Sequence, residues 1–400
     1  MNKTFFLILI SILNFYSCSS QDSKNYIFPI KDGSLHGLID INGNIITEPK
    51  YNEIGEFKES LAYVTITSNG FKAGYINKKG ELVVKPSFQP NRDISRQFSE
   101  GFAVVKVKNK YGYINKMGEI IIEPKYIRAQ KFNEGFAAVQ LTNGNKVLID
   151  KKGEIVLDAK KILHDEFGLK IERGEFVAIH DYLKENVISF ELNKYNYPFR
   201  MGVFNSEGKQ LFKLKDFRIY EYNNGIALAR TNDYKKAGYI NKKGEVIIPF
   251  KFIKASNFYN GYAKVQDETS KRFGIINEQG KYTVKPDFIS ISEKFHSNNL
   301  ILVQSIDKKY GYVDFKGNVI IDFIYDHAYD FSEGLAMVYD RIMKRRFYIN
   351  EMGEKVIELD FDTNNQSGSN FKNGLAKVKL REVGSVYINK KGEVIYKFRK

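Results

Sequence analysis

The chain has 400 residues and a formal net charge of +15, and 43% of its residues are hydrophobic, a composition typical of a folded protein. A single cysteine excludes an intrachain disulfide framework, and five histidines leave little material for metal sites. Aromatic residues make up 14% of the chain although tryptophan is absent, which favours strands over helices.

The N-terminus has the features of a targeting segment. Lys3 supplies a positive start, and the apolar run from Phe5 to Phe15 is interrupted only by Ser11 and Asn14. This run is too short to span a bilayer comfortably. Tyr16 and the small residue Ser17 follow, and then the only cysteine of the chain, Cys18.

This arrangement resembles the signal of bacterial lipoproteins, in which the cysteine becomes the lipidated first residue after cleavage. The resemblance implies a signal peptide over residues 1–17, lipidation of Cys18, and an anchor and tether over residues 18–25. The polar stretch after Cys18 suits a flexible tether. The alternative is an ordinary secretory signal with an unrelated cysteine.

A tandem repeat of about 36 residues, present in about ten copies, occupies the rest of the chain. The string Gly-Tyr-Ile-Asn-Lys-Lys-Gly-Glu at residues 74–81 recurs with small changes at residues 112–119, 238–245, 274–280, 311–317 and 387–393. The lead glycines Gly37, Gly74 and Gly112 are 37 and 38 residues apart. Such regularity indicates duplication of one structural unit.

Each unit is predicted to contain three short strands. Gly-Tyr-Ile-Asn forms the first, and the following turn ends in a glycine such as Gly80, suited to a type I turn or to the left-handed position of a bulged hairpin loop. The second strand is β-branched, as in Ile120 to Ile122, and a proline such as Pro124 ends it. The third follows Phe-x-x-Gly, whose glycine we expect at positive φ.

The repeats are predicted to cover residues 26–157 and 201–400, while residues 158–200 hold a degenerate repeat with an insertion. That insertion contains His164-Asp165-Glu166 and His180-Asp181, the densest group of potential ligands in the chain. Their spacing matches no metal-binding pattern, so we assign no metal site. We interpret the insertion as the best candidate for a specialised loop.

The repeat resembles the WG-repeat proteins of bacteria, on the strings Gly-Tyr-Ile-Asn-Lys-Lys-Gly-Glu, Val-Ile-x-Pro and Phe-x-Glu-Gly-x-Ala-x-Val. The resemblance covers nearly the whole mature chain and implies a repeat architecture with no catalytic residues to transfer. The family is named for a Trp-Gly pair at the start of the first strand. Here the tryptophan position holds His36, Ala73, Tyr111, Lys146, Met201, Ala237, Phe273, Tyr310, Arg346 or Ser385.

An all-β fold follows, because a unit of three short strands cannot bury its apolar face alone and must stack on its neighbours. We predict an open β-solenoid or superhelix. A β-propeller is the alternative, but propellers usually have four to eight blades of four strands, and units of about 36 residues are short for that. The abrupt end after Ile395 also favours a capping strand over a closed ring.

The function that the sequence predicts is that of an exported, membrane-anchored, non-catalytic scaffold of the cell envelope, periplasmic or surface-exposed, that binds a protein or a glycan. No catalytic residue, cofactor or metal site is assigned. Turn lysines at equivalent positions could form a basic edge that meets acidic polysaccharide or lipid head groups. These lysines are Lys78, Lys79, Lys116, Lys242, Lys243, Lys316, Lys390 and Lys391.

Two other functional classes were weighed. A cell-envelope enzyme would need an acidic site in a divergent loop, for which Glu358, Asp360 and Asp362 are the clustered acids. Nucleic-acid binding is suggested by the net charge and the tyrosines, but export and the absence of a single-strand stacking motif argue against it. We therefore expect no nucleic acid among the partners.

Overall fold

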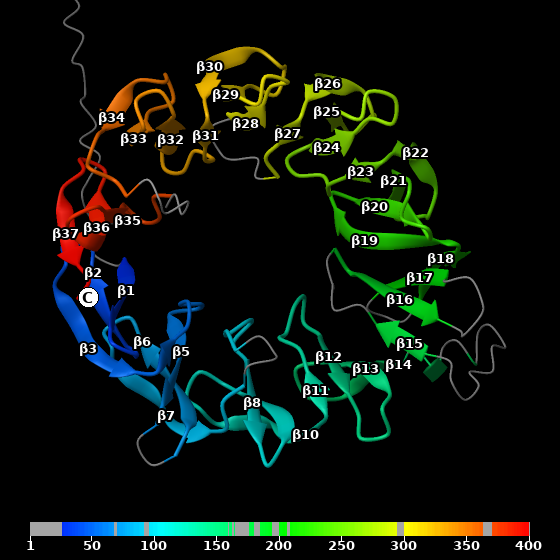
Figure 1. The fold of residues 1–400 in the computed structure, drawn as a ribbon. Helices are drawn as coiled ribbons and strands as arrows, with labels where there is room; N and C mark the ends of the chain where they lie inside the picture. The colour runs from blue at the N-terminus through cyan, green and yellow to red at the C-terminus, as the bar shows by residue number, and fades with distance from the viewer. Residues whose placement is uncertain are drawn as a thin grey trace, which may run out of the picture.

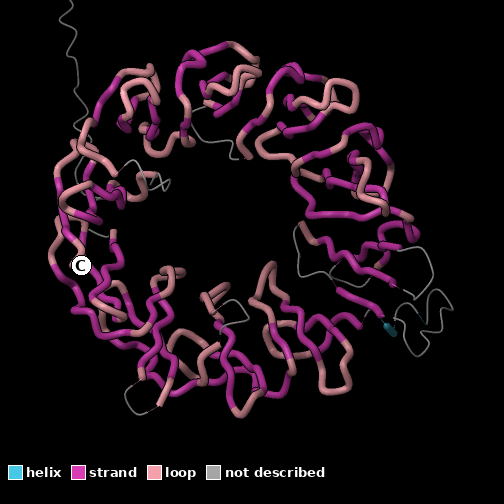
Figure 2. Tube along the Cα trace, viewed as in Figure 1, coloured by secondary structure: helices cyan, strands magenta, loops and turns pink. Residues whose placement is uncertain are grey.

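The computed structural model describes residues 26–399 except 68–69, 92–95, 159, 162–163, 165–175, 180–184, 194–199, 206–208, 294–299 and 363–369. Apart from one short helical segment that includes Lys160 and Lys161, the described residues form strands and loops (Figure 2). No helix in this part of the chain is long and apolar enough to cross a membrane. The predicted all-β class is therefore confirmed.

The described residues form ten small antiparallel sheets arranged around a ring (Figure 1). Each sheet is one blade, and we number the blades 1 to 10 in chain order. Blade 10 lies beside blade 1, so the chain closes on itself (Figure 1). The protein is a ten-bladed β-propeller.

The strands run through each blade in chain order, from the centre of the ring outward (Figure 1). Among the described residues, blades 1, 3 and 10 have three strands and lack the inner strand, and the other blades have four. The strands of blades 1 to 3 are β1 (Ile27–Asp32), β2 (Leu35–Asp40), β3 (Ile45–Tyr51), β4 (Glu53–Ile54), β5 (Leu61–Ile66), β6 (Lys72–Asn77), β7 (Leu82–Phe88), β8 (Ala103–Val107), β9 (Lys110–Ile114) and β10 (Ile120–Tyr126). Those of blades 4 and 5 are β11 (Arg128–Ala129), β12 (Ala137–Gln140), β13 (Lys146–Ile149), β14 (Ile155–Asp158), β15 (Phe176–Ile179), β16 (Val187–Asn193), β17 (Arg200–Asn205) and β18 (Gln210–Lys215).

The second half of the ring repeats this order. The strands of blades 6 to 8 are β19 (Phe217–Asn223), β20 (Ile226–Thr231), β21 (Ala237–Asn241), β22 (Val246–Phe252), β23 (Lys254–Ala255), β24 (Tyr262–Gln266), β25 (Phe273–Asn277), β26 (Tyr282–Phe288), β27 (Ser290–Ile291), β28 (Ile301–Gln304), β29 (Tyr310–Val313) and β30 (Val319–Tyr325). Those of blades 9 and 10 are β31 (His327–Ala328), β32 (Ala336–Asp340), β33 (Arg345–Ile349), β34 (Lys355–Ile357), β35 (Leu375–Leu380), β36 (Gly384–Asn389) and β37 (Val394–Lys397).

The predicted open solenoid is wrong, and so is the count of three strands per unit. A full blade also has an inner strand, which is only two residues long in blade 2 and begins two residues after β3 ends. Because the outer strand of one blade passes almost directly into the inner strand of the next, no connecting loop is needed. A repeat of about 36 residues is therefore long enough for the four strands of a propeller blade.

Ring closure depends on contacts between the two ends of the chain. The Tyr387 hydroxyl in β36 donates a hydrogen bond to the Pro29 carbonyl in β1 at 2.9 Å, and the Tyr387 ring lies 5.6 Å from that of Phe28. Arg399 pairs with Asp32 at 3.0 Å. The last strands are thus part of a closing blade, and the expectation of a free capping strand after Ile395 is wrong.

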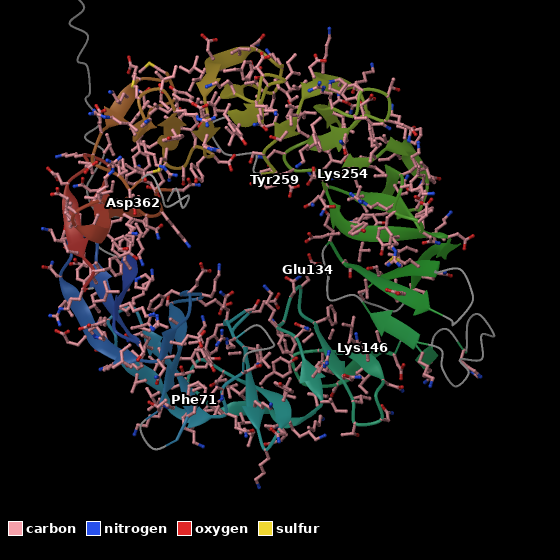
Figure 3. The ribbon with its side chains drawn as sticks, in the orientation of Figure 1. Phe71, Glu134, Lys146, Lys254, Tyr259 and Asp362 are labelled. Carbon is pink, nitrogen blue, oxygen red and sulfur yellow. The ribbon has the colours of Figure 1, made fainter. Side chains whose placement is uncertain are left out.

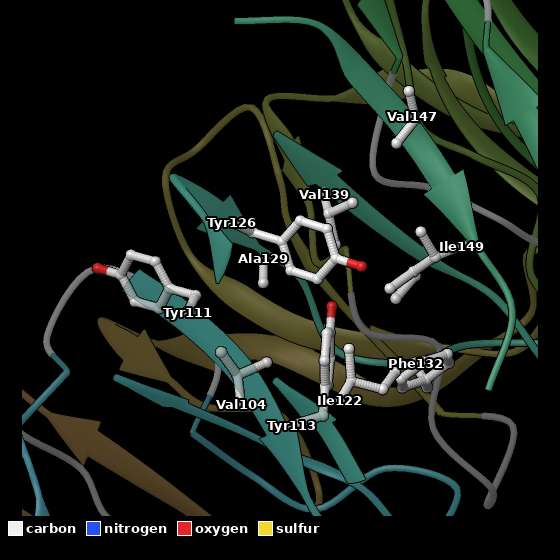
Figure 4. Close-up of a cluster of buried hydrophobic side chains, with 11 residues drawn as sticks. Val104, Tyr111, Tyr113, Ile122, Tyr126, Ala129, Phe132, Val139, Val147 and Ile149 are labelled. Carbon is white, nitrogen blue, oxygen red and sulfur yellow. The ribbon is translucent and has the colours of Figure 1, made fainter. Parts of the chain in front are cut away.

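The core lies between neighbouring blades. Figure 4 shows one such cluster, in which Tyr113 of blade 3 and Phe132 of blade 4 are both fully buried with ring centroids 4.8 Å apart. In β10, Ile122 and Tyr126 are buried whereas Ile120 and Ile121 are about half exposed, because the outer strand has only one covered face. Each blade is therefore stabilised by its neighbours.

The lead glycine lies in the Gly-Tyr-Ile-Asn strand, which is the third strand of a full blade. It allows the outer strand to cross close to this third strand. A Cβ on Gly74 would lie 2.4 Å from the Val84 carbonyl oxygen, a separation that no side chain can adopt. Where the glycine is replaced the outer strand is shorter: β34 has three residues beside Phe347, and β14 has four beside Val147. The lead glycine thus governs how far the outer strand pairs.

The turn predictions are confirmed. Gly80 has φ of +78°, and the Asn77 side chain accepts hydrogen bonds from the backbone N–H groups of Lys79 and Glu81. The glycine of Phe-x-x-Gly also has positive φ, as in Gly101 at +87°. Blade 5 is a complete sheet, β15 to β18, and the predicted degenerate repeat at residues 158–200 supplies β15, β16 and the first residue of β17.

Candidate functional site

Two devices recur at the interfaces between blades, and the first is aromatic. The tyrosine of the third strand contacts the phenylalanine of the next blade's Phe-x-x-Gly turn, as Tyr75 does with Phe98 at 4.9 Å between ring centroids. Its hydroxyl donates a hydrogen bond to a backbone carbonyl of that next blade, as Tyr113 does to Gln130 at 2.7 Å. The same ring pairs are Tyr239 with Phe258, Tyr312 with Phe331 and Tyr348 with Phe371.

The second device is a glutamate in the inner turn, which joins the inner and second strands. Glu100 has φ of +55°, and its carboxylate accepts a hydrogen bond from the Gly135 N–H of the next blade at 3.0 Å. Lys151, in that blade's outer turn between the third and outer strands, pairs with the same carboxylate at 3.0 Å. Figure 3 shows the next such glutamate, Glu134, at the inner edge of the ring. We call this arrangement the inter-blade latch.

The latch uses part of the predicted basic edge. Its cations include Lys116, Lys242 and Lys390, which pair with Glu59, Glu185 and Glu333 at 2.9, 3.1 and 3.3 Å. The remaining members are exposed, and their side chains form no ion pair with another described residue: Lys78, Lys79, Lys243, Lys316 and Lys391. They belong to blades 2, 6, 8 and 10, so they are spread around the ring rather than gathered. Their binding role stays a prediction.

The clustered acids of the alternative enzyme hypothesis are paired with cations. Glu358 contacts Lys355 at 2.8 Å and Arg345 at 3.2 Å, and the hydrogen bonds from these two cations lower the pKa of Glu358. Asp360 pairs with Arg381 at 3.4 Å, and Asp362 pairs with Lys379 at 2.9 Å. Because its pKa is lowered, Glu358 is poorly suited to act as a general acid.

Several predicted residues lie outside the described part of the chain. They are Cys18, Asp165, Glu166, His180 and Asp181. His164 is described and exposed. Among the described residues, no three histidine, cysteine or acidic side chains come together as a metal-binding group.

A cavity of about 520 Å³ opens at the seam between blades 10 and 1, and it was not predicted from the sequence. Its apolar lining includes Phe28, Leu38, Phe57, Leu375 and Tyr387. Among the described residues no strand pairs with the inner edge of β1, so the cavity lies where the other blades place an inner strand or bridge. We call it the seam cavity.

The rim of the seam cavity carries more cations than anions. Lys372 of blade 10 reaches Glu56 of blade 2 at 3.1 Å, and its hydrogen bond and charge lower the pKa of Glu56. Lys58 and Lys377 add two further cations. Burial lowers the pKa of Lys377, and the charge of Lys31 lowers it further. The rim therefore favours an anionic group.

Inside the seam cavity, burial raises the pKa of Tyr387 to about 12. The phenol is therefore protonated at neutral pH and acts as a hydrogen-bond donor. Its acceptor is the carbonyl of Pro29, a residue that has no N–H to offer to a neighbouring strand. Among the described residues, the seam thus keeps the tyrosine hydrogen bond of the other interfaces, while Phe28 and Phe398 contact the ring in place of a turn phenylalanine.

A family described as "WG containing repeat" matches seven segments of the chain. They are residues 37–68, 74–111, 111–145, 238–268, 273–310, 310–340 and 347–382. Together these segments cover more than half of the chain. A search among curated proteins gives no match.

Several solved structures align with this chain at low sequence identity. A structure described as "Crystal structure of the eukaryotic initiation factor" is 12% identical, with a TM-score of 0.51, over 83% of this chain and 95% of that chain. The designed Ika8 protein is 9% identical, with a TM-score of 0.35, over 76% and 94%. BamB from Moraxella catarrhalis is 11% identical, with a TM-score of 0.33, over 71% and 97%.

Proposed function

This chain belongs to the WG-repeat family, and we propose that it is an exported, lipid-anchored scaffold of the cell envelope that binds a protein partner through the seam cavity. The repeat propeller is consistent with a non-catalytic binding role. The partner would insert an aromatic side chain, carried on a short extended segment with acidic flanks.

The observation that carries this proposal is that, among the described residues, no turn phenylalanine contacts Tyr387, whose ring lies against Phe28 and Phe398 instead. At the other interfaces of this kind, the third-strand tyrosine contacts a buried phenylalanine such as Phe98 or Phe132. In blade 2 the equivalent phenylalanine is Phe57, which lies four residues before Leu61, the first residue of the second strand. Ser23 holds the matching sequence position before Ile27. The seam cavity beside Tyr387 is thus shaped by the family's own interface to accept an aromatic ring.

The lining favours a protein segment over a glycan. Aromatic and aliphatic side chains form more than half of the wall, which suits the insertion of an apolar side chain. The inner edge of β1 also offers backbone groups to an extended peptide, a common mode of peptide recognition. The cationic rim, with Lys58 and Lys372, suits acidic residues beside the inserted ring.

Site-specific cross-linking in native cells tests the partner. A photo-reactive benzoylphenylalanine would replace Lys372 at the rim, and in a matched control it would replace Lys243, which is exposed on blade 6. We expect one dominant protein to be captured from position 372 and not from 243. Capture of no protein at position 372, or of the same proteins at both positions, would contradict the proposal and direct attention to glycan binding.

Fractionation of the same cells tests the anchor. We expect the protein in the membrane fraction, labelled by a fatty-acid probe, and we expect Cys18→Ala to lose the label and move to the soluble fraction. A Ser19→Ala variant serves as the matched control, since it changes the adjacent residue and keeps the thiol. Unlabelled protein in both variants would mean that the segment is an ordinary secretory signal.

A further inference from the structure

Blade 9 contains a buried cation that forms no ion pair with any described residue. Arg346, at the family's tryptophan position in β33, is only 7% exposed. Its Nε has no hydrogen-bond partner in the part of the chain that the structure describes, and its guanidinium lies 5.8 Å from the centre of the Tyr339 ring. A charged group in such a place costs free energy unless an opposite charge accompanies it.

Arg346 lines a cavity of about 510 Å³ between the hairpins of blades 9 and 10. The cavity exists because Phe347 replaces the lead glycine of this unit. With that side chain in place, β34 ends at Ile357 after three residues, whereas β7 in blade 2 continues for seven. The chain from Glu358 to Phe361 then lines the cavity instead of pairing with the start of β33.

The charges around this cavity do not balance. Its lining holds Lys344, Arg345, Arg346 and Arg381 against Glu358 and Asp360. Both acids are already occupied, Glu358 by Arg345 and Lys355 and Asp360 by Arg381. Arg346 and Lys344 therefore remain without an anion among the described residues.

We propose that this cavity is a binding site for a phosphate-type oxyanion, with Arg346 as its principal ligand. A guanidinium presents planar N–H donors that match such an oxyanion in two parallel hydrogen bonds. Tyr339 holds the guanidinium from one side, and Lys344 supplies a second charge at the entrance. The oxyanion is either carried by a small soluble molecule or forms part of a lipid head group.

Phosphate titration of the purified protein, by calorimetry and thermal unfolding in phosphate-free buffer, tests the site. We expect saturable binding of inorganic phosphate with one site per chain and a melting temperature that rises with phosphate. Arg346→Met should weaken binding at least about tenfold, because it removes the charge-assisted bonds. Its melting temperature without phosphate should not fall, since the variant also removes an uncompensated buried charge.

Two further variants keep the test decisive if Arg346→Met does not fold. Lys344→Gln should weaken phosphate binding about two- to fivefold, the range that one surface charge contributes. Lys78→Gln makes the same change of net charge on blade 2 and should leave binding unchanged. Equal stabilisation of the wild type and Arg346→Met by phosphate would overturn the proposal, as would the absence of saturable binding.

The source of the oxyanion is tested with vesicles of phosphatidylcholine that contain phosphatidic acid. Arg346-dependent binding to these vesicles, in addition to free phosphate, would assign the site to a lipid head group. Binding of free phosphate without vesicle binding would assign it to a soluble ligand. Binding of neither phosphate nor vesicles would overturn the proposal.

Discussion

At the scale of single residues, glycines at the start of the third strand control the geometry of each blade. Gly74, Gly112 and Gly238 lie under outer-strand backbone that would be 2.4 to 2.6 Å from a Cβ. The outer strands beside them each have seven residues. The close approach is a backbone property, and so the glycine recurs although no turn or positive φ requires it there.

A substitution of Gly74 tests this role. Gly74→Ala should lower the free energy of unfolding by roughly 1–3 kcal/mol, because the new methyl group forces the outer strand of blade 2 away from β6. Urea denaturation would measure the change. Gly55→Ala in the same blade is the control: its Cβ would have ordinary contact with Tyr63 at 3.5 Å, and we expect a change within about 0.5 kcal/mol. Equal losses in both variants would contradict the explanation.

At the scale of elements, the inter-blade latch joins turns that belong to different blades. The Glu59 carboxylate accepts the Gly101 N–H at 3.0 Å and pairs with Lys116 at 2.9 Å. Burial by itself raises the pKa of Glu59, but the hydrogen bonds from Lys116 and Gly101 outweigh it, so the pKa lies below its ordinary value. The same balance lowers the pKa of Glu185. The latch therefore contributes stability through ionised carboxylates.

The sign of this pKa shift predicts a pH dependence. Because the folded protein lowers the pKa of Glu59, its contribution is present above about pH 4.5 and is lost as the pH falls through the lowered value. Glu59→Gln should therefore flatten the decline in stability between about pH 5 and pH 3. Thermal unfolding across that range would measure the slope. Lys116→Met should flatten it to a smaller extent, and an unchanged slope in both variants would contradict the latch.

At the scale of the whole molecule, closure makes the two ends of the chain structural neighbours. Tyr387 of blade 10 performs for blade 1 the hydrogen bonding that Tyr312 performs between blades 8 and 9. In an open array each unit contacts only its sequence neighbours, so a change in the last unit would stay local. In the ring, the same change reaches β1 and β2.

Hydrogen exchange distinguishes these arrangements. Tyr387→Phe should remove one hydrogen bond, worth about 1 kcal/mol, and accelerate amide exchange in blade 1 as well as in blade 10. Tyr312→Phe, the control, should accelerate exchange in blades 8 and 9 and leave blade 1 unchanged. Exchange in blade 1 that does not respond to Tyr387→Phe would argue against closure through this contact.

Local features were predictable because neighbouring residues determine them. The outer-turn glycine Gly80 and the inner-turn glycine Gly101 both have the positive φ that their motifs require. The inner strand was missed because two residues such as Glu53 and Ile54 carry too short a pattern to read as a strand. The predicted lysines were found on turns. Whether one of them pairs in the latch or faces solvent depends on the preceding blade, which supplies the glutamate.

By itself the sequence determined the repeat, three of the four strands of a full blade, the turns, and the all-β class, since these follow from spacing, alternation and turn chemistry within about 36 residues. It did not determine the inner strand or the end of the outer strand, since β10 continues through Pro124 to Tyr126. Only the tertiary structure decided between an open array and a ring, because closure rests on contacts such as Tyr387 with Pro29, at opposite ends of the chain. It also revealed the seam cavity and the buried Arg346. Each arises where one unit departs from the repeat. The neighbouring blade supplies part of the lining of the cavity that results.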